Sequence, residues 1–445
     1  MEKAKYLLLS VFLITLLGCE KDNKYSDDDF HPRIFGSAFN SNTRVINEGQ
    51  STTFNGLTFS PSPAGKTSIT WKVNGEVVST DTVFTFEPES PDVYEIKLEA
   101  TFNGQTATRK ANVIVNPLTY TFKPYTNVIM PYISSGGIVK YIDWSAITHI
   151  AYNGARVIPD GTVDFSAGNV GQLADEIVAK AHINGLPALL GVSGRLSGLD
   201  GWSVYNSSDF GNVISDPALR AILVQQLVDY VSVRRFDGID IMMTDVGNDD
   251  ATIVDRNMKA ITTLIQDLKS VLPAEAIITV TVAANWLHWN YNDLSAANWL
   301  NVHAFENGVH VGPGVPLGQP SPLSFMQECA NIWKDTKGYP ADKLVIGVPA
   351  FGLQYNELDT DGNNLGWSSY SYIAYKDIIA ADPTAPQNEF TDKIGQGVYY
   401  NGVPLVSQKA QYIKDNGFKG AYIWAGDYDT TGSNSLTTIL SQILK

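Results

Sequence analysis

The chain has 445 residues, more than one ordinary domain holds, so we expect two domains and a leader. Hydrophobic residues make up 44% and charged residues 17%, a balance typical of a soluble globular protein with a full core. The formal net charge of −15 argues against nucleic acid and anionic membrane surfaces as partners, because both need clustered lysine and arginine.

The N-terminus has the pattern of an export signal. Lys3 and Lys5 precede an apolar run, Tyr6 to Leu17, that is too short for a membrane-spanning helix. The sequence LLGC, which ends at Cys19, resembles the lipobox of bacterial lipoproteins. This resemblance implies that residues 1–18 are a signal peptide and that Cys19 carries the lipid. An ordinary cleaved signal followed by a chance cysteine is the alternative.

Residues 19–31 are expected to form a flexible tether, because EKDNKYSDDD (20–29) is polar and poor in apolar side chains. Acidic stretches directly behind the lipidated cysteine resemble the surface-export signals of Bacteroidetes lipoproteins. The resemblance implies an outer-membrane lipoprotein that faces the cell exterior and touches the membrane only through its lipid. A simple solvated linker is the alternative.

Residues 32–117 have the pattern of a small all-β domain. Alternating runs meet at Asn74-Gly75 and at Asn103-Gly104, and Asn-Gly between two such runs predicts a hairpin. Trp71 and Tyr94 resemble the core Trp and corner Tyr of immunoglobulin-like or PKD-like sandwiches. We expect this domain to act as a spacer, with direct sugar binding as the alternative.

Residues 121–445 alternate apolar strands with amphipathic helices, which predicts an α/β fold, a (β/α)8 TIM barrel with its active site at the C-terminal strand ends. The eight expected strands are Val128–Tyr132, His149–Asn153, Ala188–Ser193, Gly238–Met243, Ile277–Ala284, Trp299–Phe305, Leu344–Pro349 and Ala421–Ala425. Helical patterns between them cover Gly171–His182, Pro217–Arg234, Asp255–Val271 and Ser407–Asp415.

Two cysteines so far apart argue against a disulfide framework and a cysteine zinc site. Cys329 falls in a helical pattern, Ser324 to Thr336, where a buried inert thiol is expected.

The fourth strand carries the most informative motif, FDGIDIMMTD, from Phe236 to Asp245. It resembles the DGxDxDxE motif of family 18 glycoside hydrolases, which include chitinases and endo-β-N-acetylglucosaminidases. Asp237 and Asp240 match the motif. Met242 stands in the slot of its third aspartate, and Thr244 stands in the slot of its catalytic glutamate.

Five further segments resemble family strands in the correct order: THIAYN, ALLGVSGR, LNVHAFEN, GVPAFG and GAYIWAGDYD. The resemblance places Phe305 and Glu306 in the slots of a tyrosine and an aspartate that line the site. It also places Trp424 at the tryptophan that floors the central sugar subsite. It implies no metal and no cofactor.

In that family the substrate's own N-acetyl oxygen attacks the sugar, the glutamate protonates the leaving oxygen, and the aspartate orients the acetamido group. General acid catalysis contributes about 10² to 10⁴ in rate, and neither Thr244 nor Met242 can supply it. We therefore expect no catalytic residue. Asp245 is an alternative acid, although strand alternation turns it away from the face of 240, 242 and 244. Asp237, and Asp240 without its partners, also fit purely structural roles.

Aromatic, amide and carboxylate side chains at the expected strand ends suit a sugar. The candidate binding residues are Tyr132, Asp240, Asn285, Trp286, Phe305, Glu306 and Trp424, with Trp289, Tyr291 and Trp367 in nearby loops. For the loop from Asn285 to Tyr291, packing on the barrel rim is the alternative.

These residues together predict a surface-anchored, inactive barrel that binds N-acetylglucosamine-containing glycans, such as N-glycans or chitin fragments, beside neighbouring glycan-uptake proteins. One alternative is an active endo-β-N-acetylglucosaminidase or chitinase with a displaced acid. Another is an adhesion or scaffold protein with no sugar ligand.

Overall fold

The computed structural model describes residues 31–64, 66–165, 170–195, 208–242, 245–284, 289–306 and 309–445. The expected signal peptide, Cys19 and nearly all of the tether lie outside these ranges. The chain divides into two compact units, and the larger contains Ile114–Lys445. No helix in the described ranges is long and apolar enough to cross a membrane.

The N-terminal region is all-β, as predicted. Its main sheet has the order β2 (Thr43–Asn47), β9 (Gln105–Asn116), β8 (Val93–Phe102), β5 (Ser68–Val73) and β6 (Glu76–Ser79). Two smaller sheets pair β1 (Arg33–Phe35) with β4 (Thr58–Ser60) and β3 (Thr52–Phe54) with β7 (Phe84–Phe86).

Both predicted Asn-Gly turns join neighbouring strands of that main sheet. Asn74-Gly75 connects β5 to β6, Asn103-Gly104 connects β8 to β9, and all four residues have positive φ. The fully buried Trp71 packs against Phe54 and Phe84, so it forms the core of the domain.

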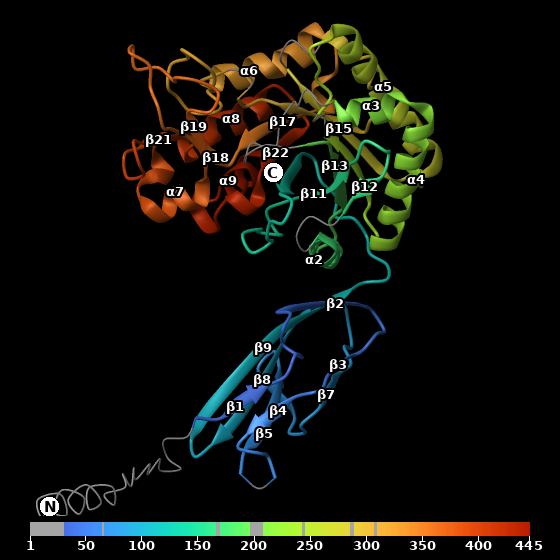
Figure 1. The fold of residues 1–445 in the computed structure, drawn as a ribbon, viewed down its shortest axis with the longest axis vertical. Helices are drawn as coiled ribbons and strands as arrows, with labels where there is room; N and C mark the ends of the chain where they lie inside the picture. The colour runs from blue at the N-terminus through green and yellow to red at the C-terminus, as the bar shows by residue number, and fades with distance from the viewer. Residues whose placement is uncertain are drawn as a thin grey trace, which may run out of the picture. The chain divides into compact units, whose positions relative to one another are not determined.

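The larger unit is a closed (β/α)8 barrel (Figure 1). Eight parallel strands follow one another around the ring, and a β10–β11 pairing closes it. The strands are β10 (Val128–Ile133), β11 (Ile150–Val157), β13 (Ala188–Ser193), β14 (Gly238–Met242), β15 (Ile277–Ala283), β16 (Trp299–His303), β17 (Leu344–Pro349) and β22 (Gly420–Trp424). All eight predicted strands are therefore confirmed, with ends that differ by a few residues.

Helices surround this ring, and the four predicted ones are present. They are α2 (Val170–Ile183), α3 (Asp209–Ser215), α4 (Pro217–Arg234), α5 (Ala251–Val271), α6 (Leu323–Asn331), α7 (Tyr375–Ala381), α8 (Val403–Asp415) and α9 (Leu436–Leu444). A π-helical segment, Ile332–Thr336, follows α6, and short 3₁₀ helices occur at Ala341–Lys343, Ala385–Gln387, Gly426–Tyr428 and Gly432–Asn434. A two-residue strand, β12 (Val163–Asp164), pairs antiparallel with β11.

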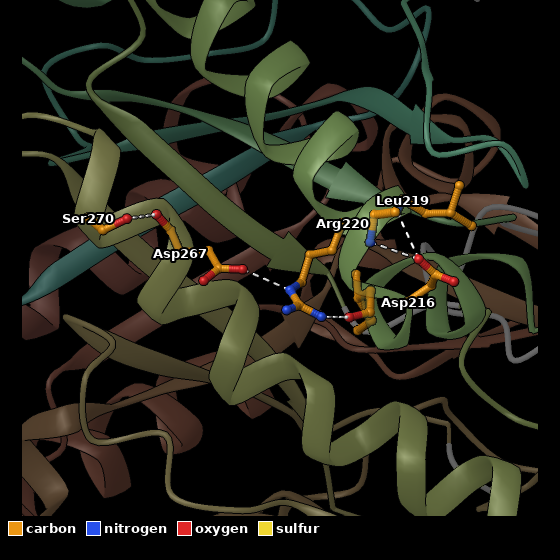
Figure 2. Close-up of polar contacts among 7 residues, drawn as sticks. Asp216, Leu219, Arg220, Asp267 and Ser270 are labelled. Atoms are coloured by element: carbon orange, nitrogen blue, oxygen red, sulfur yellow. Dashed lines mark hydrogen bonds and ion pairs between the residues drawn. The ribbon is translucent and has the colours of Figure 1, made fainter.

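Helix α4 shows how local sequence sets the barrel's outer layer. Asp216 caps its N-terminus by accepting hydrogen bonds from the backbone N–H groups of Ala218 and Leu219 at 2.8 and 3.1 Å. Arg220 then donates to the Asp267 carboxylate of α5 at 2.7 Å (Figure 2). The cap begins the helix, and the ion pair fixes it against its neighbour.

The segment after the seventh barrel strand forms a sheet of its own. Its strands have the order β19 (Tyr370–Ala374), β18 (Phe351–Tyr355), β21 (Val398–Tyr400) and β20 (Phe390–Thr391), and their pairings are antiparallel. The exposed Trp367 lies in the loop that leads from β18 to β19.

A lysine is buried beside this part of the barrel. Lys409 of α8 has no exposed surface, and its Nζ donates to Ser321 Oγ and Asn401 Oδ1, both at 2.6 Å. Burial lowers the pKa of Lys409 to about 7, although nearby Cys329 and Glu389 oppose that effect.

We therefore expect Lys409→Met to change how stability depends on pH. The unfolded chain holds the lysine proton up to a pKa of 10.5, so the folded state gains stability as pH rises from about 7 towards 10.5. The slope from this group is at most about 1.4 kcal/mol per pH unit. Urea unfolding of both proteins between pH 7 and 9.5 should show the slope in the wild type and its loss in Lys409→Met. Parallel curves would contradict this expectation.

Candidate functional site

The site is built around a buried carboxylate inside the barrel. Asp240 of β14 has no exposed surface, and four side chains donate to it. Tyr132 and Thr281 donate to Oδ2 at 2.6 and 3.2 Å, whereas Thr279 and Asn301 donate to Oδ1 at 2.6 and 2.9 Å. These donors come from β10, β15 and β16, so the closed ring brings them together.

All four donors to Asp240 are uncharged. Burial raises the pKa of the Asp240 carboxyl, and the four hydrogen bonds partly offset that rise. Asn301 is itself oriented by Trp299, whose Nε1 donates to its Oδ1 at 3.0 Å. Both oxygens of Asp240 accept hydrogen bonds, and its side chain has no exposed surface. We therefore interpret Asp240 as a residue that holds the barrel strands together and does not face a bound ligand.

The methionine that replaces the motif aspartate at position 242 is packed inside the barrel. Met242 follows Asp240 by two residues on β14, so both side chains share one strand face. It is 2% exposed, and its sulfur lies 3.3 Å from where a Cβ on Gly191 would stand. A thioether packed against the glycine of β13 thus occupies the position that an aspartate holds in the motif. Thr244, Asn285 and Trp286 lie outside the described residues.

The predicted aromatic residues do meet. The ring centroids of Tyr132 and Trp424 lie 5.3 Å apart. The ring of Tyr422 packs against that of Tyr132 and lies 6.2 Å from the ring of Phe305. Tyr132, Trp424 and Phe305 are only 1–3% exposed. Trp424 therefore offers little surface to a sugar in this conformation, whereas Trp367 is 67% exposed.

Glu306 links the barrel to its inserted sheet. It follows β16 in a left-handed conformation with φ 58° and is 6% exposed. The hydroxyl of Tyr372, on β19, donates to Glu306 Oε1 at 2.5 Å. The motif reading missed Tyr372 because it lies in the insertion. Thr279, Thr281 and Asn301 were missed as well, although polar residues at inward positions of buried strands are a usable signal.

Asp237 lies at the opposite, N-terminal end of β14. Its Oδ2 accepts from the backbone N–H of Ala188 at 2.8 Å and lies 3.1 Å from His182 Nε2, and its Oδ1 accepts from the Tyr120 hydroxyl. The Tyr120 ring stacks on His182 with 3.9 Å between centroids. These contacts give Asp237 a structural role at the N-terminal end of β14, whereas Met242 lies at its C-terminal end.

Asp245 lies beyond the end of β14, so strand alternation does not set its direction. It has φ 59° and no exposed surface, and its backbone oxygen accepts from Gly211 N at 3.3 Å. An acidic side chain is therefore enclosed just past the motif.

Cys329 is 1% exposed within α6, and burial raises the pKa of its thiol to about 12. Among the described residues, no group of three His, Cys, Asp or Glu side chains is placed to hold a metal ion.

Curated relatives match the barrel at low identity. The mouse oviduct-specific glycoprotein is 23% identical over 316 residues, which cover 61% of this chain and 43% of that protein. Mouse chitotriosidase-1 is 22% identical over 275 residues, covering 53% of this chain and 58% of its own length. The chain thus spans less than two thirds of these relatives.

Solved structures show the same fold. A chitinase from Bacteroides thetaiotaomicron has a TM-score of 0.55 and 21% identity, covering 72% of this chain and 97% of that one. Human YKL-39, described as a pseudo-chitinase with retained chitooligosaccharide binding properties, has a TM-score of 0.55 and 18% identity, covering 72% and 99%. The sequence profile of glycosyl hydrolases family 18 matches residues 128–429. This chain therefore belongs to glycoside hydrolase family 18.

Proposed function

We propose that the barrel binds glycans that contain N-acetylglucosamine, such as chitin fragments or N-glycans, and does not hydrolyse them. The observation that carries the proposal is Met242, buried on the inward face of β14 where the family motif has a carboxylate. Its thioether neither orients an acetamido group nor shares a proton. Thr244, in the slot of the acid, has a hydroxyl that does not ionise usefully near neutral pH.

Retained binding has support of its own. The aromatic cluster of Tyr132, Phe305 and Trp424 is intact, and Glu306 is held by Tyr372 at the barrel's C-terminal end. Human YKL-39, which shares the fold, is described as keeping chitooligosaccharide binding as a pseudo-chitinase. These observations are therefore consistent with a family 18 barrel that still binds its glycan but no longer hydrolyses it.

The proposal includes anchoring at the cell surface. Cys19 would carry the lipid, residues 19–31 would serve as the tether, and the β domain would hold the barrel away from the outer membrane. There the protein would hand captured glycans to neighbouring hydrolases and uptake proteins.

We expect native mass spectrometry of the mature chain with chitooligosaccharides and an N-glycan panel to show intact bound glycan and no fragments. Long incubation at stoichiometric protein lets one spectrum report both complexes and products. Thr244→Ala should give the same spectrum, because this threonine donates no proton in our proposal. Fragments that accumulate with the wild-type chain would contradict the proposal, and an absence of complexes would favour a scaffold without a sugar ligand.

The second candidate is a hydrolase of the chitinase or endo-β-N-acetylglucosaminidase type with a displaced acid. The enclosed position of Asp245, one residue beyond the slot of the family's acid, favours it. Cleavage that survives in Thr244→Ala and disappears in Asp245→Asn would establish this alternative.

A further inference from the structure

A cavity lies at the N-terminal strand ends of the barrel. It has a volume of about 450 Å³, within the range of small-molecule sites. We propose that it binds one sugar unit that carries a carboxylate, such as a uronic acid residue. This inference is independent of the site described above.

The position of the cavity separates it from the family's site. Its walls come from residues 123–127, 144–145, 147–148 and Leu186, which precede β10, β11 and β13, and from Lys445, which follows α9. The N-terminal ends of three neighbouring strands therefore surround it, and the motif positions beyond Asp240 lie at the opposite ends. A ligand here does not compete with a glycan at the C-terminal face.

The cavity is lined by positively charged side chains, although the protein as a whole is negatively charged. Two ammonium groups, from Lys123 and Lys445, line it in a chain whose net charge is −15. Lys445 Nζ donates to the backbone oxygen of Ser145 at 2.8 Å, which fixes its place in the wall. Neither lysine forms an ion pair with another residue in the part of the chain that the structure describes.

One carboxylate that acts on Lys445, that of Asp143, is hydrogen-bonded to Ser145. Asp143 Oδ1 accepts from Ser145 N at 3.0 Å and from Ser145 Oγ at 2.6 Å. Burial lowers the pKa of Lys445, Asp143 raises it, and the like charge of Lys123 lowers it again, so the two lysines influence each other. A bound carboxylate would relieve that repulsion.

An aromatic wall is held in place beside these charges. Tyr125 is 41% exposed, and its ring meets the ring of buried His149 edge-on at 4.6 Å. Lys419 lies 5.9 Å from the centroid of the same ring. Tyr125 thus lines the cavity with a ring that His149 and Lys419 contact.

The remaining lining chooses among anions. Half-buried Trp144 offers a second apolar face. The Asn127 amide already donates to Leu444 O, and the Thr148 hydroxyl is already bonded to Ile129 N and His149 Nδ1. Phosphate and sulfate have no apolar surface to pack against the two aromatic side chains, and both are small for a cavity of this volume. A pyranose carboxylate uses both the lysines and the aromatic walls, because it has one negative charge and apolar C–H faces.

The test compares methyl β-glucuronide with methyl β-glucoside, which differ mainly in the carboxylate, by isothermal titration of the full mature chain. We expect the glucuronide to bind at least tenfold more tightly. The double variant Lys123→Gln/Lys445→Gln should weaken glucuronide binding at least tenfold and leave chitooligosaccharide binding unchanged. Lys393→Gln, which removes one exposed charge on the inserted sheet, should leave both unchanged.

Several results would overturn the inference. Equal affinity for the two glycosides would remove the role of the lysines, and full competition by inorganic phosphate would reduce the site to an anion patch. Loss of glucuronide binding in Trp424→Ala would assign the ligand to the main site. The comparison of glycosides on the wild-type chain decides the question even if the lysine variant folds poorly.

Discussion

Replacing Asp240 with alanine is expected to lower the free energy of unfolding of the barrel by about 3–5 kcal/mol. The substitution removes a fully buried carboxylate and leaves Tyr132, Thr279, Thr281 and Asn301 with donors that water cannot reach. It also opens a small void in the closed ring. The barrel's transition in urea, followed by tryptophan fluorescence at pH 7, measures the loss.

Two variants make that result interpretable. Asp240→Asn keeps the size of the side chain but turns an NH₂ group towards some of the donors, so its loss should lie between those of wild type and Asp240→Ala. Asp250→Ala removes an exposed carboxylate that caps α5, and it should cost clearly less than Asp240→Ala. If Asp240→Ala cost no more than Asp250→Ala, then Asp240 would not anchor the ring.

The second large effect is a gain of activity. The double variant Met242→Asp/Thr244→Glu is expected to raise the hydrolysis rate of chitooligosaccharides at least about 10²-fold, the lower bound for general acid catalysis. An aspartate at 242 would share the strand face of Asp240, so the two carboxyls would favour sharing a proton. Space is available, because aspartate is smaller than the methionine that now packs against Gly191.

Release of a fluorogenic aglycone from a chitotrioside, together with product chromatography, measures this gain. Thr244→Glu alone should gain less, because the acetamido group would lack its orienting carboxylate. The amide double variant Met242→Asn/Thr244→Gln should remain inactive while it occupies the same space. A double carboxylate variant that binds glycan but shows no gain would place the loss of activity elsewhere in the site.

Much of the fold is readable from local pattern. The eight barrel strands and both Asn-Gly hairpins occur where period and turn chemistry predict them, because hydrophobic periodicity and positive φ are properties of short segments. The sequence also shows that Met242 and Thr244 replace the two carboxylates of the family motif, and the proposed loss of catalysis follows from this replacement.

Contacts between distant segments are a different matter. Asp240 and Tyr132 are separated by 108 residues, and Glu306 and Tyr372 by 66. No local pattern specifies such pairs, because they depend on how the ring closes and where the insertion packs. The same applies to the near-complete burial of Trp424, since only the assembled barrel determines how much surface an aromatic side chain retains.

The sequence by itself determined the barrel, its family and the residues that replace the motif's carboxylates. Only the tertiary structure decided that Asp240 is an anchor enclosed by neutral donors and that two lysines line a cavity at the N-terminal strand ends. The physical reason is that periodicity and side-chain chemistry belong to the chain, whereas burial, the setting of a charge and the volume of a cavity belong to the packed molecule.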